Sequence, residues 1–128
     1  MKILLVEDDA PLADVIARNL RARGHALTVA GTAEAALLSM VEAWPDVLIL
    51  DVNLPDQTGW DVLRRLTAAD RTRISVIVIS AAPISEKRVV EFQPLRHLQK
   101  PFPIEALVRL LTEVAPSGST TKETEESS

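Results

Sequence analysis

The 128-residue sequence predicts an α/β domain, in which helices cover both faces of a parallel sheet. Short apolar segments and longer segments with helical spacing alternate five times along the chain. The short segments are continuously apolar rather than alternating, which is typical of strands buried on both faces. Apolar residues make up 47% of the chain, which is enough to build one core.

Each element follows from a local pattern. The expected strands are residues 2–6, 26–30, 47–50, 74–79 and 95–99. Pro11 suits the first turn of a helix that stops at Gly24, and Thr32 is expected to cap a second helix leading to Trp44-Pro45. The remaining helices are expected at residues 57–67, 85–92 and 103–114. Pro94 makes the fourth helix in chain order short or irregular.

The composition changes near Pro116, so we expect one domain over residues 1–115. Residues 116–128 contain no large apolar side chain and are expected to form a disordered polar tail or a linker. The chain has no cysteine and no apolar run long enough to span a membrane. A net charge of −4 argues against a nucleic-acid surface. We therefore expect a soluble cytoplasmic protein without direct membrane or nucleic-acid contacts.

Side chains capable of chemistry follow four of the five expected strands. Asp8 and Asp9 come after the first strand, Asp51 ends the third, Ser80 follows the fourth and Lys100 follows the fifth. In a doubly wound sheet of flavodoxin-like order, 2-1-3-4-5, the carboxyl ends of these four strands lie at one edge. We therefore expect the five side chains to converge there.

Three carboxylates cannot lie close together in ionised form without a cation. Asp8, Asp9 and Asp51 are oxygen ligands without His or Cys, a set that suits Mg²⁺. Asp51 is then placed to attack phosphorus, while the metal and Lys100 neutralise the developing charge. Taken singly, each residue has an ordinary alternative: Asp9 a helix N-cap, Ser80 a turn residue and Lys100 a solvated loop charge.

Over residues 2–114 the sequence resembles the receiver domain of two-component response regulators. The resemblance rests on Ile3-Leu4-Leu5-Val6-Glu7-Asp8-Asp9, on Asp51 followed by Leu54-Pro55 and Gly59, on Ser80-Ala81 and on Lys100-Pro101-Phe102. It implies that Asp51 is the phosphoacceptor and that Ser80 and Lys100 hold the phosphate. It also implies that Asp8, Asp9, Asp51 and the main-chain carbonyl of Asn53 bind Mg²⁺. The peptide bond between Lys100 and Pro101 is commonly cis in this family.

The same resemblance implies a function and partners. A receiver takes a phosphoryl group from a histidine kinase or a phosphotransfer protein in a Mg²⁺-dependent reaction. It catalyses its own phosphorylation and dephosphorylation, and is a switch rather than an ordinary enzyme. It then signals through phosphorylation-dependent contacts with a downstream protein or an output domain. A phosphorylation-linked homodimer would use the surface of the fourth helix, fifth strand and fifth helix.

Two departures from the family pattern concern switching. His97 stands three residues before the lysine, where receivers usually carry Tyr or Phe. It is either a half-exposed strand-edge residue or a smaller polar side chain that moves together with Ser80. The interval between Ser80 and Lys100 is short and contains Pro94.

Two other functions compete with this one. The first is a degenerate receiver that acts as an interaction scaffold without phosphorylation. The second is a phosphohydrolase of the haloacid-dehalogenase type, which also uses a strand-end Asp with Mg²⁺. Such enzymes need a second Asp two residues after the nucleophile, where this chain has Asn53. A dinucleotide-binding module is excluded because the turn after the first strand has no glycine.

Overall fold

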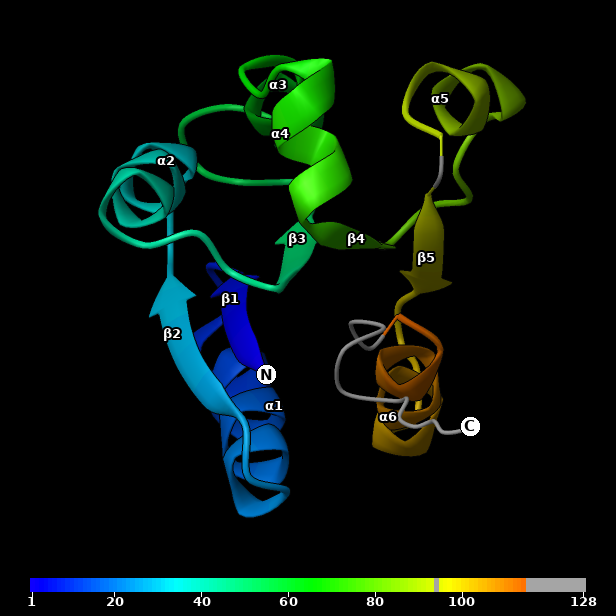
Figure 1. The fold of residues 1–128 in the computed structure, drawn as a ribbon. Helices are drawn as coiled ribbons and strands as arrows, with labels where there is room; N and C mark the ends of the chain where they lie inside the picture. The colour runs from blue at the N-terminus through cyan, green and yellow to red at the C-terminus, as the bar shows by residue number, and fades with distance from the viewer. Residues whose placement is uncertain (94, 115–128) are drawn as a thin grey trace, which may run out of the picture.

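A computed structural model describes residues 1–93 and 95–114 and contains one five-stranded parallel sheet. The strand order is β2-β1-β3-β4-β5, as the sequence predicts (Figure 1). The strands are β1 (Lys2–Val6), β2 (Ala26–Ala30), β3 (Val47–Asp51), β4 (Ser75–Ser80) and β5 (Arg96–Gln99). The sheet therefore has β3 at its centre and β2 and β5 at its edges.

Two apolar clusters lie on opposite faces of the sheet. Figure 1 shows α1 (Ala10–Ala22) and α6 (Ile104–Glu113) on one side, where Leu5, Ile49 and Leu107 belong to one buried cluster. The other side carries α2 (Ala33–Glu42), α3 (Gly59–Arg64), α4 (Ala68–Arg73) and α5 (Glu86–Glu91). Every residue of β3 is buried, so the acceptor candidate at its end lies against the core.

The expected helix over residues 57–67 is shorter than predicted, and a separate helix follows it. Thr58 and Asp61 form a capping box that begins α3, and Thr67 and Asp70 form a second one that begins α4. Each box satisfies two backbone N–H groups that would otherwise lack a partner, so the chain can start a helix twice within ten residues. No residue of α4 is buried, which explains why an apolar pattern did not reveal it.

The prediction that the helix over residues 85–92 is short is confirmed by α5, which has six residues and no buried side chain. Phe92, which follows α5, is buried and stacks on Trp60 of α3 with ring centroids 5.5 Å apart. Arg64 of α3 and Arg88 of α5 both form salt bridges with Glu91. An aromatic stack and a small ionic group thus hold α5 against α3.

The loop after β3 also holds the start of α2. The carboxylate of Asp56 accepts hydrogen bonds from the backbone N–H groups of Ala33 (2.9 Å) and Glu34 (3.1 Å). The hydrogen bond from Ala33, the strongest of several causes, lowers the pKa of Asp56 below its ordinary value of 3.8. Asp56 is therefore a helix cap supplied from another part of the chain.

Replacing Asp56 with Ala should lower the thermal unfolding midpoint at neutral pH, because two N–H groups of α2 lose their acceptor. A carboxyl whose pKa is lowered by folding stabilises the folded state above its unfolded pKa. That stabilisation is lost as the pH falls through the folded pKa. The difference between wild type and Asp56→Ala should therefore shrink below about pH 3.8. Asp14→Ala, at an exposed salt bridge, is the control, and a difference that persists unchanged in acid would contradict this role.

Across the described residues, no helix is long and apolar enough to cross a membrane. The expectation of a polar tail over residues 116–128 falls outside the described part of the chain.

Candidate functional site

The carboxyl ends of β1, β3, β4 and β5 meet at one edge of the sheet. Asp51 is the last residue of β3 and is buried, and Lys100 directly follows β5. The Nζ atom of Lys100 lies 2.9 Å from Oδ2 of Asp51 and 2.8 Å from Oε1 of Glu7, the residue after β1. The other oxygen of Asp51 accepts a hydrogen bond from the backbone N–H of Asn53. The structure thus joins two buried carboxylates through one ammonium group.

Burial and the neighbouring charges shift the pKa values of Glu7 and Lys100. Burial, opposed by Lys100 and reinforced by the neighbouring Asp51, raises the pKa of Glu7 from 4.5 to about 7. Burial alone would lower the pKa of Lys100, but the carboxylates of Glu7 and Asp51 outweigh it and raise that pKa above its ordinary value. This edge of the sheet thus combines two buried carboxylates with the ammonium group that they share.

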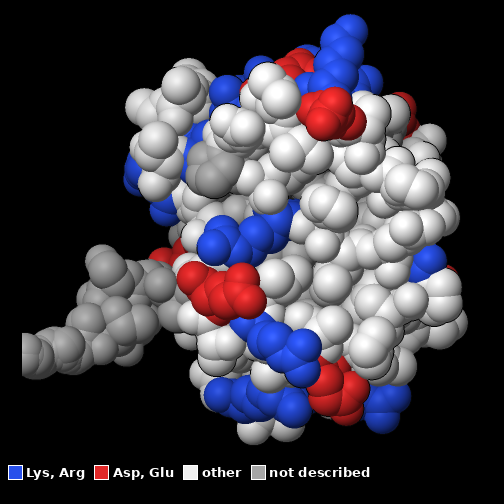
Figure 2. All heavy atoms as spheres, turned by 90° about the vertical axis from the view of Figure 1, so that its right-hand side faces the viewer, with Lys and Arg blue, Asp and Glu red and all other residues white. Residues whose placement is uncertain are grey.

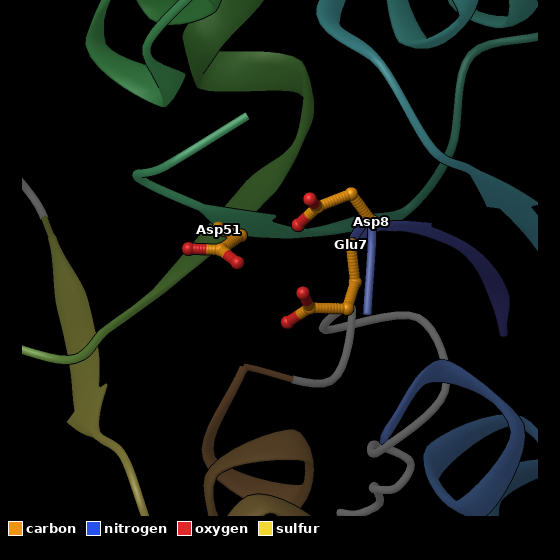
Figure 3. A group of neighbouring side chains, drawn as sticks. All are labelled: Glu7, Asp8 and Asp51. Atoms are coloured by element: carbon orange, nitrogen blue, oxygen red, sulfur yellow. The ribbon is translucent and has the colours of Figure 1, made fainter. Parts of the chain in front are cut away.

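Glu7, Asp8 and Asp51 form a group suited to a metal ion. Each offers a carboxylate oxygen, and these oxygens all lie within 4.8 Å of one another; Figure 3 shows the three carboxylates directed toward a common space. Oε1 of Glu7 is buried and paired with the ammonium group of Lys100. A set of carboxylate oxygens held this close together fits a hard cation.

Asp9 lies elsewhere than expected. Its side chain accepts a hydrogen bond from the N–H of Leu12 at 3.2 Å and caps α1, which has Pro11 in its first turn. It is not part of the metal-suited group, and its place in that group is taken by Glu7, to which its own N–H donates a hydrogen bond. The physical reason is that β1 ends at Val6, so Glu7 still faces the buried edge, whereas Asp9 is already at the helix start.

Ser80 and His97 occupy different environments. Ser80 ends β4 and is buried, and its hydroxyl donates to the carbonyl of Ala82. Its own carbonyl accepts a hydrogen bond from the N–H of Lys100, which ties the ends of β4 and β5 together. His97 is an exposed residue of the edge strand β5, paired in register with Val78. The structure therefore places Ser80 at the site and His97 on the surface.

The backbone around the site is closely fitted. The peptide bond between Lys100 and Pro101 is cis, as the family resemblance implies. Asn53 forms an isolated bridge with Thr58, and the N–H of Gly59 donates to the carbonyl of Val52 at 2.8 Å. A Cβ atom on Gly59 would lie 2.5 Å from the main-chain oxygen of Asp51. A residue without a side chain is therefore needed where α3 begins against the backbone of Asp51.

Replacing Gly59 with Ala should destabilise the domain by about 1–3 kcal/mol, the usual cost of an extra methyl group in a packed region. The new methyl group would push against the backbone of Asp51 and the side chain of Leu50. Urea unfolding measures the change. Gly31→Ala is the matched control, because a Cβ there meets no atom within 4 Å. Equal midpoints for Gly59→Ala and Gly31→Ala would show that this contact is not tight in solution.

This arrangement of carboxylates, hydroxyl and lysine at the ends of a 2-1-3-4-5 sheet defines a receiver domain. The sequence profile of the response regulator receiver domain matches residues 3–112, and the chain belongs to this family. Similar proteins are named as transcriptional regulatory and sensory transduction proteins, which agrees with the assignment of this chain to two-component response regulators.

Three curated relatives illustrate the similarity. The chain is 34% identical over 122 residues to "Probable transcriptional regulatory protein TcrX" of Mycobacterium tuberculosis, covering 93% of this chain and 52% of that protein. It is 32% identical to the sensory transduction protein RegX3 of Mycolicibacterium smegmatis, covering 91% and 51%. It is 33% identical to the DNA-binding response regulator MtrA of Mycobacterium leprae, covering 84% and 48%. The chain thus spans about half the length of the relatives it matches.

Solved structures agree on the fold. The chemotaxis response regulator CheY4 of Vibrio cholerae superposes with a TM-score of 0.80 at 25% identity, covering 88% of this chain and 97% of that one. The receiver domain of the hybrid histidine kinase CckA superposes with a TM-score of 0.76 at 29% identity, covering 91% and 100%. Both are similar to this chain over nearly all of its described residues.

Proposed function

We propose that Asp51 accepts a phosphoryl group from a histidine kinase or a phosphotransfer protein, and that this event changes the domain's contacts with other proteins. The observation that carries the proposal is the position of the Asp51 carboxylate. It ends the central strand, 2.9 Å from the ammonium of Lys100 and beside the carboxylates of Glu7 and Asp8. A nucleophile with cations on both sides is what phosphoryl transfer requires.

Each residue has a distinct role in the proposed reaction. An oxygen of Asp51 attacks phosphorus as the bond to the donor's histidine nitrogen breaks, which leaves an acyl phosphate on Asp51 and the donor imidazole free. Lys100 then pairs with a phosphoryl oxygen instead of the free carboxylate, and the hydroxyl of Ser80 turns from Ala82 to donate to another. Water attack on phosphorus restores Asp51 and releases phosphate, in steps that the domain itself promotes.

Mg²⁺ is the proposed cofactor, held by Glu7, Asp8 and Asp51 with the main-chain carbonyl of Asn53. It would supply positive charge for the phosphoryl oxygens. Asp9 was the other candidate ligand, but its side chain caps α1, whereas Glu7 offers a carboxylate oxygen within 4.8 Å of those of Asp8 and Asp51. The cation set we propose therefore contains Glu7 instead of Asp9.

Asp8→Asn should weaken Mg²⁺ binding markedly, because it removes one of three charged ligands. Asp9→Ala should retain Mg²⁺ binding and lose about 1 kcal/mol of stability, the usual cost of an N-cap. Titrations followed by amide chemical shifts, with urea unfolding alongside, separate the two effects. If Asp9→Ala weakens binding as much as Asp8→Asn does, Asp9 belongs in the site after all.

The residues of the site fit the two alternative functions less well than they fit the proposed one. A scaffold that works without phosphorylation does not need the buried ion group of Glu7, Asp51 and Lys100. A phosphohydrolase of the haloacid-dehalogenase type needs an acid where Asn53 stands, and its nucleophile follows the first strand rather than the third. Phosphorylation of wild type but not Asp51→Asn, measured by intact mass, decides between the proposal and the scaffold.

The remaining partner proposals follow from the receiver family. We propose a cytoplasmic location, a signalling surface formed by α5, β5 and α6, and a target that is either a separate protein or an output domain. Figure 2 shows that side of the molecule, where basic and acidic residues lie next to one another. Pairs such as Arg88–Glu91 and Arg96–Glu113 account for this mixed pattern. A surface with both signs of charge suits a protein partner better than nucleic acid.

A further inference from the structure

Asp56 joins the loop after β3 to the start of α2 through both oxygens of its carboxylate. Oδ1 accepts hydrogen bonds from the backbone N–H groups of Ala33 (2.9 Å) and Gln57 (3.0 Å), and Oδ2 accepts one from Glu34 (3.1 Å). Three backbone donors therefore occupy this carboxylate, and it does not belong to the metal-suited group described above. Asp56 is thus a cross-link between two segments of the chain and not a further metal ligand.

The loop after β3, residues 52–58, contains the proposed carbonyl ligand of Asn53. The loop is closed by the isolated bridge between Asn53 and Thr58 and by the hydrogen bond from the N–H of Gly59 to the carbonyl of Val52. No backbone N–H group of the described residues donates to the carbonyl of Asn53 itself, so that oxygen is available to a cation. The position of this ligand therefore depends on how firmly the loop is held.

The start of α2 is also tied to the strand end that carries the acidic ligands. The N–H of Glu7 donates to the carbonyl of Ala30, the last residue of β2, at 3.0 Å. Ala30 lies three residues before Ala33, at which α2 begins. The short segment between β2 and α2 therefore connects Glu7 at one end to Asp56 at the other.

We propose that Asp56 is a positioning residue for the cation site: by binding the start of α2, it holds the carbonyl of Asn53 in place beside the acidic ligands. The inference rests on the Mg²⁺ site of the proposed function and adds to it a residue that does not touch the ion. A ligand that is held in place before binding loses less conformational freedom when the ion arrives. Groups that orient metal ligands in this way typically contribute about 10–100-fold to metal affinity.

The test compares the Mg²⁺ dissociation constants of variants of the full 128-residue chain, measured from amide chemical shifts. Asp56→Ala should raise the dissociation constant about tenfold, the lower end of the range for groups that orient metal ligands. The shift that saturating Mg²⁺ produces at the amide of Asp51 should remain, because every proposed ligand is still present. Asp56→Asn should bind Mg²⁺ more tightly than Asp56→Ala, because its amide oxygen can still accept a hydrogen bond from Ala33.

Two control variants separate positioning from helix capping and from charge. Thr32→Ala removes the hydrogen bond that the N–H of Ala35 donates to the N-cap of the same helix (3.0 Å), and releases no residue of the 52–58 loop. Glu34→Gln removes one negative charge from the start of α2 and keeps the backbone N–H that donates to Asp56. Both should bind Mg²⁺ as wild type does, although Thr32→Ala should lower the thermal unfolding midpoint.

Hydrogen exchange in wild type is a second measurement, which needs no substitution. If Asp56 links the Mg²⁺ site to α2, then Mg²⁺ binding must in turn stabilise the hydrogen bonds between Asp56 and α2. Saturating Mg²⁺ should therefore slow the exchange of the N–H groups of Ala33 and Glu34. It should slow the N–H of Asp70, which Thr67 caps at the start of α4, to a smaller extent.

Several results would overturn the inference while Mg²⁺ binding by wild type left the proposed cation site standing. Asp56→Ala could bind Mg²⁺ as tightly as wild type, or Asp56→Asn no better than Asp56→Ala. Thr32→Ala or Glu34→Gln could weaken binding as much as Asp56→Ala does, or Mg²⁺ could leave the exchange at the start of α2 unchanged. A wild-type chain that binds no Mg²⁺ would instead overturn the cation site itself, and this inference with it.

Discussion

Asp51→Asn should abolish both the acyl phosphate and the binding of beryllofluoride, a phosphoryl mimic, while leaving the fold unchanged. An amide is not a nucleophile toward phosphorus and carries no charge for Lys100 to balance. Asn matches Asp in shape, and its neutrality removes the repulsion that Asp51 exerts on buried Glu7. The urea midpoint should therefore stay close to that of wild type. The adduct, followed by intact mass with Mg²⁺ and a small phosphodonor, should fall from full occupancy to none.

Two controls accompany this result: a chemical test of the adduct and a substitution at a different aspartate. Hydroxylamine should release the wild-type adduct, because it cleaves acyl phosphates, and Asp14→Asn on the surface of α1 should retain it. An adduct that survives Asp51→Asn would move the phosphoacceptor to another residue. A wild-type chain that takes up neither phosphoryl group nor beryllofluoride would favour the scaffold function.

Replacing Lys100 with Ala should have opposite effects on two ligands of the same site. Beryllofluoride should bind about 10–100-fold more weakly, because a charge-assisted hydrogen bond contributes about 1.5–3 kcal/mol. Mg²⁺ should bind more tightly to the ligand-free domain, because Glu7 and Asp51 lose the ammonium that competes for their oxygens. Beryllofluoride at saturation should no longer shift the amide signals of Ser80 and Ala81 as in wild type.

Amide shifts and calorimetry on the same samples measure all three effects, with Lys87→Ala on exposed α5 as the control. The assigned role of Lys100 requires the loss of the Ser80 response. A Lys100→Ala domain in which beryllofluoride shifts Ser80 as fully as in wild type would show that Lys100 does not couple the phosphoryl group to β4.

Much of the fold could be predicted because each strand is a continuous apolar segment with a clear end. The expected bounds of β1 and β2 match the structure, and the flavodoxin-like strand order expected for the sheet is the order observed. The short α5 could be predicted from Pro94. By contrast, α4 buries none of its residues, so apolar spacing carried no sign of it. Its signal was the capping pair Thr67 and Asp70, three residues apart.

The candidate site was predicted in part for a related reason. Asp51, Asp8 and Lys100 end or follow strands, so strand ends alone locate them. Glu7 was not predicted to join the metal-suited group, because two adjacent aspartates suggest a metal pair more strongly than a glutamate beside them. Pro11 contained the correcting signal, since a proline in the first helical turn leaves Asp9 at the N-cap. The exposure of His97 depends on β5 being an edge strand and needed the structure.

The site is assembled from the ends of four strands that span positions 7 to 100 of the chain. Glu7 directly follows β1 and Lys100 directly follows β5, so the two side chains meet only when both strands are in the sheet, and a ligand of this site recognises the folded sheet. Binding to the folded state alone adds about 2.7 kcal/mol of stability at a ligand concentration 100 times its dissociation constant. A ligand bound to the few oxygen atoms at this edge should thus slow proteolysis across the whole sheet. This includes β2, which contributes no side chain to the site.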